Sequence, residues 1–296
     1  MAAPTESPLS DPPDLRRHPW DRRIAIITIV TVLAAVGIVV WVAAHNVQTA
    51  RTFRLHPPGG KTKYPIGIVD ATAPSGMAPP APDALKGYTL SYSTDFDGTT
   101  LPPGWDVFTG VPGGDPGGHF DAKHVVVGNG LLSLNTWRDP AYANKWVTGG
   151  LCQCGVSHVY AGYFVRSRIT GGGPNEVELL WPLTNVWPPE VDFNETGSKA
   201  TRTSATVHFG AANNIDQLGL AMDMTKWHTW GVIVSKKAIT FTVDGEKWGI
   251  VTAKGEIPSK QMTLDLEQRA SCQAVQDCPK VPVTMQVDWV AEYTPI

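Results

Sequence analysis

Three acidic residues within six positions carry the strongest chemical signal in the sequence. Glu190, Asp192 and Glu195 lie in the stretch WPPEVDFNET, residues 187–196. Successive side chains of a β-strand point to opposite faces, so Glu190 and Asp192 share one face. Close carboxylates on one wall repel each other, which raises the pKa of at least one of them. Such a cluster can hold both an ionised nucleophile and a protonated acid.

Glu195 reaches the same face only if the strand is irregular, because its offset from Glu190 is odd. A single β-bulge near Phe193 or Asn194 would bring it back, and bulges are enriched beside active sites. With one residue absorbed, the two Cα atoms of the glutamates lie roughly 13 Å apart, or four strand rises. Two long side chains leaning together could close the gap to about 5 Å, the separation expected in a retaining glycosidase.

A solvated acidic strand face is the simpler explanation of this short pattern. The flanking residues favour a sugar-binding cleft instead. Trp181, Trp187 and the Pro188-Pro189 pair are costly on an ordinary soluble surface, whereas aromatic rings suit the wall of a cleft that binds pyranose rings.

The composition indicates which elements position these residues. The chain has 296 residues, a net charge of −3 and only 17% charged residues, which indicates one good-sized core and no nucleic-acid partner. The 29 glycines and 25 prolines indicate many turns, and long amphipathic helical patterns are hard to find after residue 50. An all-β fold is therefore expected.

Short strand patterns joined by turn signals predict a sandwich of two antiparallel sheets. Gly128-Asn129-Gly130 is the turn of a predicted hairpin, and Asp244-Gly245 is a strong type I′ signal inside a predicted meander. The strands are expected at His124–Val127, Leu131–Thr136, Tyr160–Ile169, Trp227–Val234, Ala238–Val243, Lys247–Val251 and Val283–Trp289.

The amino-terminal part predicts a membrane-tethered protein. Residues 1–23 are rich in proline and polar groups and are expected to form a disordered cytoplasmic tail. Residues 24–44 are an apolar run long enough to cross a bilayer, and the arginines before it favour a cytoplasmic amino terminus with the remainder outside the cell. A cleavable signal peptide is the alternative. Residues 45–85 are expected to be a Pro-rich linker, and residues 86–296 the folded domain.

The four cysteines follow this predicted membrane segment, and outside the cell disulfides are favoured. Four cysteines permit three pairings, of which Cys272 with Cys278 is preferred for one bridge, leaving Cys152 and Cys154. The alternative is a metal site made of Cys152, Cys154 and His158, which lacks a convincing fourth ligand.

Several pieces of the sequence, in order, resemble glycoside hydrolase family 16, the laminarinase-like β-jelly-roll enzymes. The central piece is EVDFNE at Glu190–Glu195, which is similar to the bulged ExDxxE signature of that family. The others are TDFDG at Thr94–Gly98, LLWP at Leu179–Pro182, TVHFG at Thr206–Gly210, WHTWGV at Trp227–Val232, VDG at Val243–Gly245 and VDWV at Val287–Val290.

The resemblance implies a concanavalin A-like jelly roll and assigns roles to the three acids. Glu190 would be the nucleophile, Glu195 the acid/base, and Asp192 the residue that assists them by tuning their protonation. No cofactor is required for this chemistry. Among the departures from the family pattern, Pro189 stands where a glycine often precedes the first glutamate, and LDLEQRASC (264–272) lacks the usual small-residue ending.

Further positions are implied for the substrate and for a metal ion. Trp181 and Trp187 would be sugar platforms, and His208 either a polar neighbour of the acid/base or a histidine satisfied near the core. Asp95 and Asp288 stand where many members of the family hold a structural calcium, an ion that prefers oxygen ligands. Two solvated carboxylates are the alternative.

The sequence therefore predicts a membrane-tethered extracellular endo-β-glycanase. It would hydrolyse β-glucan-type polysaccharide with β-1,3 or mixed β-1,3/1,4 linkages, with retention of configuration, and act as a monomer. A transglycosylase would use the same residues. A non-catalytic carbohydrate-binding module is a third interpretation, although binding alone does not need three close carboxylates.

Overall fold

The computed structural model describes residues 51–52, 63–270, 272 and 278–296. The predicted cytoplasmic tail (1–23) and membrane anchor (24–44) lie outside the described residues, as does part of the predicted linker. Within the described part of the chain, no helix combines the length and the apolar character that crossing a bilayer requires.

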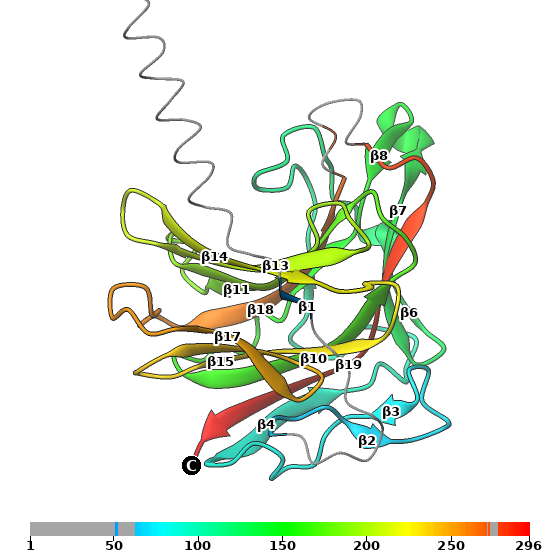
Figure 1. The fold of residues 1–296 in the computed structure, drawn as a ribbon. Helices are drawn as coiled ribbons and strands as arrows, with labels where there is room; N and C mark the ends of the chain where they lie inside the picture. The colour runs from blue at the N-terminus through cyan, green and yellow to red at the C-terminus, as the bar shows by residue number, and fades with distance from the viewer. Residues whose placement is uncertain (1–50, 53–62, 271, 273–277) are drawn as a thin grey trace, which may run out of the picture. The chain divides into compact units, whose positions relative to one another are not determined.

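The described residues form two large sheets that pack face to face, as the sequence predicts (Figure 1). All pairings in them are antiparallel except that of β1 with β14. The eight-stranded sheet has the order β1 (Arg51–Thr52), β14 (Asn214–Ala221), β13 (Arg202–Phe209), β12 (Glu190–Glu195), β11 (Asn175–Pro182), β18 (Met262–Arg269), β9 (Gly150–Cys152) and β5 (Asp106–Val107).

The nine-stranded sheet has the order β17 (Glu246–Val251), β16 (Ile239–Val243), β15 (His228–Val234), β10 (Ala161–Ile169), β19 (Val283–Pro295), β7 (Leu131–Asp139) and β6 (Val125–Gly128). In addition, β4 (Tyr88–Thr94) pairs with β19, and β8 (Lys145–Val147) pairs with β7. A separate ribbon consists of β2 (Ile68–Val69) and β3 (Met77–Ala78), and the 3₁₀ turns are η1 (Ala122–His124) and η2 (Pro140–Tyr142).

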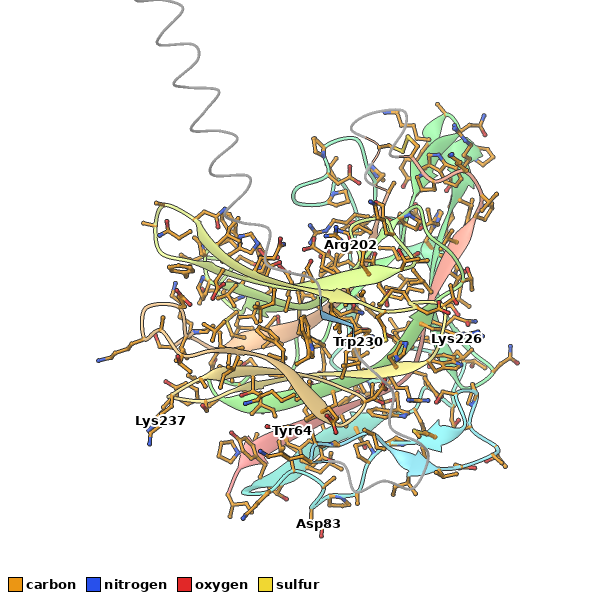
Figure 2. The ribbon with its side chains drawn as sticks, in the orientation of Figure 1. Tyr64, Asp83, Arg202, Lys226, Trp230 and Lys237 are labelled. Atoms are coloured by element: carbon orange, nitrogen blue, oxygen red, sulfur yellow. A yellow bond between two sulfur atoms is a disulfide. The ribbon has the colours of Figure 1, made fainter. Side chains whose placement is uncertain are left out.

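The main core lies between the two sheets and follows the period of two expected for strands. Val191 and Phe193 of β12 and Leu180 of β11 point inward and are completely buried. Trp230 of β15 meets them from the nine-stranded sheet and lies between the layers (Figure 2). The alternate residues of β11, β12 and β18 consequently point away from the core, onto the outer face of the eight-stranded sheet.

Both turns singled out in the sequence form tight hairpins. Asn129 and Gly130 join β6 to β7 with φ angles of 56° and 69°, and Asp244 and Gly245 join β16 to β17 with φ angles of 48° and 80°. Two successive residues with positive φ are the mark of a type I′ turn, which matches the twist of the flanking strands. The predicted hairpin and meander are confirmed.

Residues 63–85, expected to belong to the linker, pack against the outer face of the nine-stranded sheet. Leu85 is buried in a second apolar cluster with Trp289 and Tyr293 of β19. The Nε1 atom of Trp289 donates to the carbonyl of Met77 at 3.1 Å, and the hydroxyl of Tyr293 donates to that of Ala81 at 2.6 Å. Figure 1 shows β2 and β3 on this side of the sheet. This apolar face needs a cover, so the folded unit extends to the amino-terminal side of Lys86.

A buried arginine fixes the same segment. Arg166 of β10 is 6% exposed, and its guanidinium donates to the hydroxyl and the carbonyl oxygen of Ser75 and to the hydroxyl of Thr229. The amide of Ser75 donates to Asp288 of β19 at 3.0 Å. A buried guanidinium needs such acceptors, because leaving it unpaired is costly.

Two disulfides form among the described residues. They join Cys152 to Cys154 and Cys272 to Cys278, which confirms the preferred pairing. The alternative metal site is excluded because both thiols of its cysteine pair are consumed, and His158 contacts Glu292 at 3.2 Å instead.

The packing of residues 63–85 on the nine-stranded sheet predicts how truncation of the chain affects its stability. A chain beginning at Lys86 should be less stable than one beginning at Lys63 by at least about 3 kcal/mol, since it loses two buried hydrogen bonds and the burial of Leu85. Urea denaturation of both chains measures the difference. Equal free energies of unfolding would show that residues 63–85 contribute nothing to the fold.

Candidate active site

A cleft of about 800 Å³ lies on the outer face of the eight-stranded sheet, and Glu190, Asp192 and Glu195 all line it. Each comes from β12, whose inward residues belong to the core. The cleft therefore has a rigid floor of paired strands.

A β-bulge brings Glu195 onto this face. Asp192 pairs with Thr206 of β13 and Glu195 pairs with Ser204, so two residues of β12 oppose one of β13. The pairing of β12 with β11 shifts at the same place. The bulge expected from the sequence is thus confirmed, and without it Glu195 would point into the core.

Different partners hold the two glutamates. The indole Nε1 of Trp187 donates to Glu190 Oε2 at 2.6 Å, and the amide Nδ2 of Asn175 donates to Glu195 Oε1 at 3.0 Å. The hydroxyl of Thr206 lies 3.5 Å from the other oxygen of Glu195. Glu190 is 7% exposed, so its bond to the indole replaces much of the hydration that a carboxylate loses on burial.

Asp192 lies between the glutamates and is 3% exposed. Burial, followed by the charge of Glu190, raises the pKa of Asp192 well above its usual range. His208 of β13 has its Nε2 atom 3.6 Å from Asp192 Oδ2. The pKa of His208 is raised to about 9, chiefly by its contact with Asp192. The contact therefore favours the protonated form of His208 beside the carboxyl group of Asp192.

Two tryptophans line the cleft. Trp181 and Trp187 both line it, and Trp187 is 41% exposed despite its bond to Glu190. Trp181 is oriented by a 2.9 Å hydrogen bond from its Nε1 to Asn185. Large apolar side chains with exposed faces are typical of surfaces that bind sugars.

Comparisons of the structure identify the fold. The laminarinase of Rhodothermus marinus superposes with a TM-score of 0.64 at 18% identity, covering 71% of this chain and 98% of that chain. The fold is that of the laminarinases. The Thermotoga maritima laminarinase catalytic domain gives a TM-score of 0.61 at 15% identity, covering 71% of this chain and all of that chain.

A third structure belongs by its description to family GH16. It is the Bacteroides ovatus mixed-linkage glucan enzyme in complex with a G4G4G3G product, with a TM-score of 0.58 at 18% identity over 68% of this chain and 99% of that chain. No protein-family model and no curated protein matches the sequence.

On this laminarinase-like fold, β18 adds charged residues to the cleft that the sequence interpretation missed. Asp265, Glu267 and Arg269 alternate along β18 and line the cleft together. Arg269 Nε donates to Glu267 at 2.7 Å. Burial, followed by the charge of Glu267, raises the pKa of Asp265 well above its usual range. The available signal is the alternation of acidic and apolar residues in LDLE, residues 264–267.

Two further carboxyl groups lie behind the cleft, inside the core. Glu176 and Glu178 of β11 are completely buried. Burial raises the pKa of Glu176 to about 8, and burial, followed by the charge of Glu176, raises the pKa of Glu178 well above its usual range. Both environments therefore favour the neutral form of the carboxyl group. The sequence does not reveal these two residues, because acidic residues inside a sandwich have no distinctive spacing.

Asp95 and Asp288 lie far from this chemistry, beside the nine-stranded sheet. They line one hollow of about 260 Å³ together with Asp70, Asp97 and Asn129. Among the residues that the structure describes, ligand atoms of three metal-binding side chains converge only at Asp106, Cys152 and Cys154, where the cysteines form a disulfide. A cation between Asp95 and Asp288 would therefore need backbone or amide oxygens as well.

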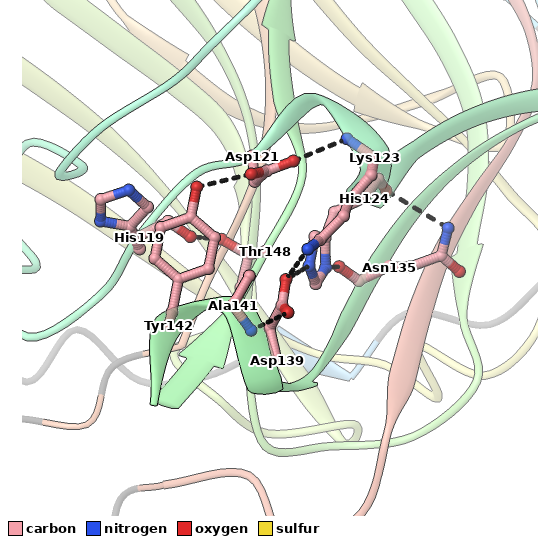
Figure 3. Close-up of polar contacts among 9 residues, drawn as sticks. All are labelled: His119, Asp121, Lys123, His124, Asn135, Asp139, Ala141, Tyr142 and Thr148. Atoms are coloured by element: carbon pink, nitrogen blue, oxygen red, sulfur yellow. Dashed lines mark hydrogen bonds and ion pairs between the residues drawn. The ribbon is translucent and has the colours of Figure 1, made fainter. Parts of the chain in front are cut away.

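A cluster of histidine and carboxylate side chains lies near β7 and β8 (Figure 3). None of the residues drawn there lines the cleft. The Nε2 atom of His124 contacts Asp139 at 3.2 Å, and its Nδ1 atom contacts the carbonyl of Asn135 at 3.0 Å. Its ring stacks on Trp137 with centroids 3.6 Å apart. Both ring nitrogens of His124 have partners on β7, and the side chain has no exposed surface. His124 therefore stabilises the packing around β7 and is not available for catalysis.

The buried Glu176 predicts a pH dependence of stability. Its pKa is raised in the folded protein, so unfolding releases a proton between the unfolded value near 4.5 and about 8. The free energy of unfolding should fall with rising pH in this window by about 1.4 kcal/mol per pH unit for each proton.

Glu176→Gln should remove one proton's share of that slope and should stabilise the protein most at pH 8. Urea denaturation at pH 5, 6, 7 and 8 provides the measurement. Asp83→Asn is the control, because Asp83 is exposed (Figure 2). An unchanged slope in Glu176→Gln would mean that this carboxyl is ionised in the folded state.

Proposed function

We propose that the protein is a retaining endo-β-glycanase that hydrolyses β-glucan-type polysaccharide with β-1,3 or mixed β-1,3/1,4 linkages. The observation that carries this proposal is the bulged strand, which directs Glu190, Asp192 and Glu195 into one cleft. A surface that only bound sugars would gain nothing from carboxyl groups so close together, since each costs solvation free energy.

Glu190 is the nucleophile in this proposal. Its carboxylate attacks the anomeric carbon while Glu195 donates its proton to the departing glycosidic oxygen, so the bond to the leaving sugar breaks as the glycosyl ester forms. Glu195 then accepts a proton from water, whose oxygen attacks the anomeric carbon and releases Glu190. The hydrogen bond from Trp187 orients the carboxyl group of Glu190.

Asp192 assists by holding a proton between the two glutamates. Because it is nearly unexposed and flanked by both, its neutral form limits the negative charge on the cleft floor. His208 is its partner and supplies positive charge when protonated.

The substrate class rests on the shape of the cleft and on the structural neighbours. Trp181 and Trp187 offer ring faces for pyranose units, and the cleft volume accommodates several of them. Two of the similar structures are described as laminarinases, and the third carries a mixed-linkage product. These likenesses support β-glucan over other polysaccharides.

A transglycosylase is the second candidate, because the same three residues would transfer the glycosyl unit to another sugar in place of water. A cleft that is open and lined by both sheet and loop residues leaves space for such an acceptor. The apolar run at 24–44 supports a single-pass protein of the cell membrane with its catalytic domain outside, where either reaction would meet a surface polysaccharide.

The proposed roles predict the behaviour of two variants. Glu190→Gln and Glu195→Gln should each reduce hydrolysis of a β-glucan by at least about 1,000-fold, because each removes a group that takes part in bond breaking. The thermal midpoint should move by only a few degrees. Product masses, with and without an added glycosyl acceptor, separate hydrolysis from transfer. Undiminished turnover in either variant would refute the assigned role.

Structural calcium is a further proposal for Asp95 and Asp288. The hollow that they line holds carboxylate and amide oxygens, which are the donors that calcium prefers. Calcium at 100 times its Kd should stabilise the folded protein by about 2.7 kcal/mol. The thermal midpoint should therefore rise with calcium and fall with a chelator, and Asp288→Asn should abolish the response. A midpoint insensitive to calcium would remove this site.

A further inference from the structure

The bulge sends two consecutive side chains of β12 into the core. Phe193 and Asn194 are both completely buried, and Phe193 joins the apolar cluster. Asn194 is polar and needs partners there, because an unpaired buried amide is costly. Its Oδ1 atom accepts a 2.6 Å hydrogen bond from the hydroxyl of Thr203 on β13.

The hydroxyl of Thr203 also reaches the residue that follows. Its Oγ1 atom accepts a 2.9 Å hydrogen bond from the backbone amide of Glu195. Thr203 is 1% exposed, so no solvent competes for these bonds. A single oxygen thus joins the inner side of the bulge to the backbone of the cleft residue Glu195, whose carboxyl group is held on the opposite face by Asn175.

Glu178 lies beside Asn194 on the neighbouring strand. The two residues are paired in the register of β11 and β12, and both side chains are fully buried. Ser167 of the nine-stranded sheet donates to Glu178 Oε1. Among the described residues, Glu178 Oε2 and Asn194 Nδ2 are each buried without a hydrogen-bond partner, and they are an acceptor and a donor on directly paired residues. Strand pairing places this donor beside this acceptor.

We propose that Thr203, Asn194 and Glu178 are positioning residues that hold Glu195 in place from inside the sandwich. The proposal rests on the function proposed above, in which Glu195 is the acid/base. Hydrogen bonds join Ser167 of the opposite sheet to Glu178, and Asn194 through Thr203 to the amide of Glu195, while strand pairing places Glu178 beside Asn194. None of them touches substrate, because all of their side chains point into the core.

This arrangement predicts which chemical step depends on it. Glu190 is held by Trp187 on the cleft side, so loosening Thr203 should disturb proton transfer by Glu195 more than nucleophilic attack. Cleavage of a sugar–sugar bond needs the proton of Glu195, whereas a dinitrophenyl leaving group departs without one.

Thr203→Val keeps the shape of the side chain and removes its hydroxyl. In the full chain it should lower kcat on a β-1,3-gluco-oligosaccharide by about 10- to 100-fold and leave KM within about 3-fold. Single-turnover release of dinitrophenol from a dinitrophenyl β-gluco-oligosaccharide should change by less than about 3-fold. Thr203→Ser should restore most of kcat, because it returns the hydroxyl.

Two references accompany this measurement. Thr242→Val is the matched control, since the Thr242 hydroxyl is buried in the nine-stranded sheet without a partner among the described residues. It should leave both reactions unchanged. Glu195→Gln should show the same selective loss as Thr203→Val, but larger. If Glu195→Gln shows no such selectivity, the proposed function is wrong, and the inference is overturned with it.

If Glu195→Gln is selective and Thr203→Val is not, only the positioning inference is overturned. An equal loss on both substrates in a folded Thr203→Val protein would mean a general structural role and would also overturn it. Should Thr203→Val fail to fold, Glu178→Gln and Glu178→Met take its place. The glutamine variant matches the neutral carboxyl group and should stay near the original kcat, whereas the methionine variant should show the selective loss. Any other outcome contradicts the proposal.

Discussion

The β-bulge of β12 is the feature on which the candidate active site depends. One extra residue between Asp192 and Glu195 turns an odd spacing into a shared face, so that a six-residue strand presents three acids to one cleft. The bulge must be stabilised for two reasons. The extra residue directs a second consecutive side chain to the inner face of the sheet, and it interrupts the ladder of hydrogen bonds between the strands. Phe193 supplies apolar burial, and Asn194 engages the hydroxyl of Thr203.

The site also shows how the electrostatic repulsion between three neighbouring carboxyl groups is reduced. Each carboxyl group has a different environment: an indole donor at Glu190, an amide donor at Glu195, and a histidine beside the nearly unexposed Asp192. Arg269 supplies a further cation and pairs with Glu267. Since environment decides which acid is ionised, these partners allow one proton donor and one nucleophile to coexist.

Much of the fold could be predicted because its signals are local. The turns at Asn129-Gly130 and Asp244-Gly245 and the alternation of apolar residues depend only on neighbouring positions, and the structure contains both hairpins. The bulge was predictable because three acids at that spacing make chemical sense only on one face. The cover formed by residues 63–85 was not, because a segment rich in proline and alanine packs through isolated contacts such as those to Trp289 and Tyr293.

The site and core residues that could not be predicted from the sequence depend on contacts between strands that are distant in the sequence. Asp265 and Glu267 line the cleft only because β18 lies beside β11. The spacing of residues within one strand does not predict which strands are neighbours in the sheet. Glu176 and Glu178 are acidic residues on an inward face, where local pattern predicts apolar ones. Their burial is tolerable when they are neutral and when Glu178 receives a hydrogen bond from Ser167. Glu178 also places a polar atom beside the buried amide of Asn194 on the neighbouring strand, which an apolar side chain at this position could not do.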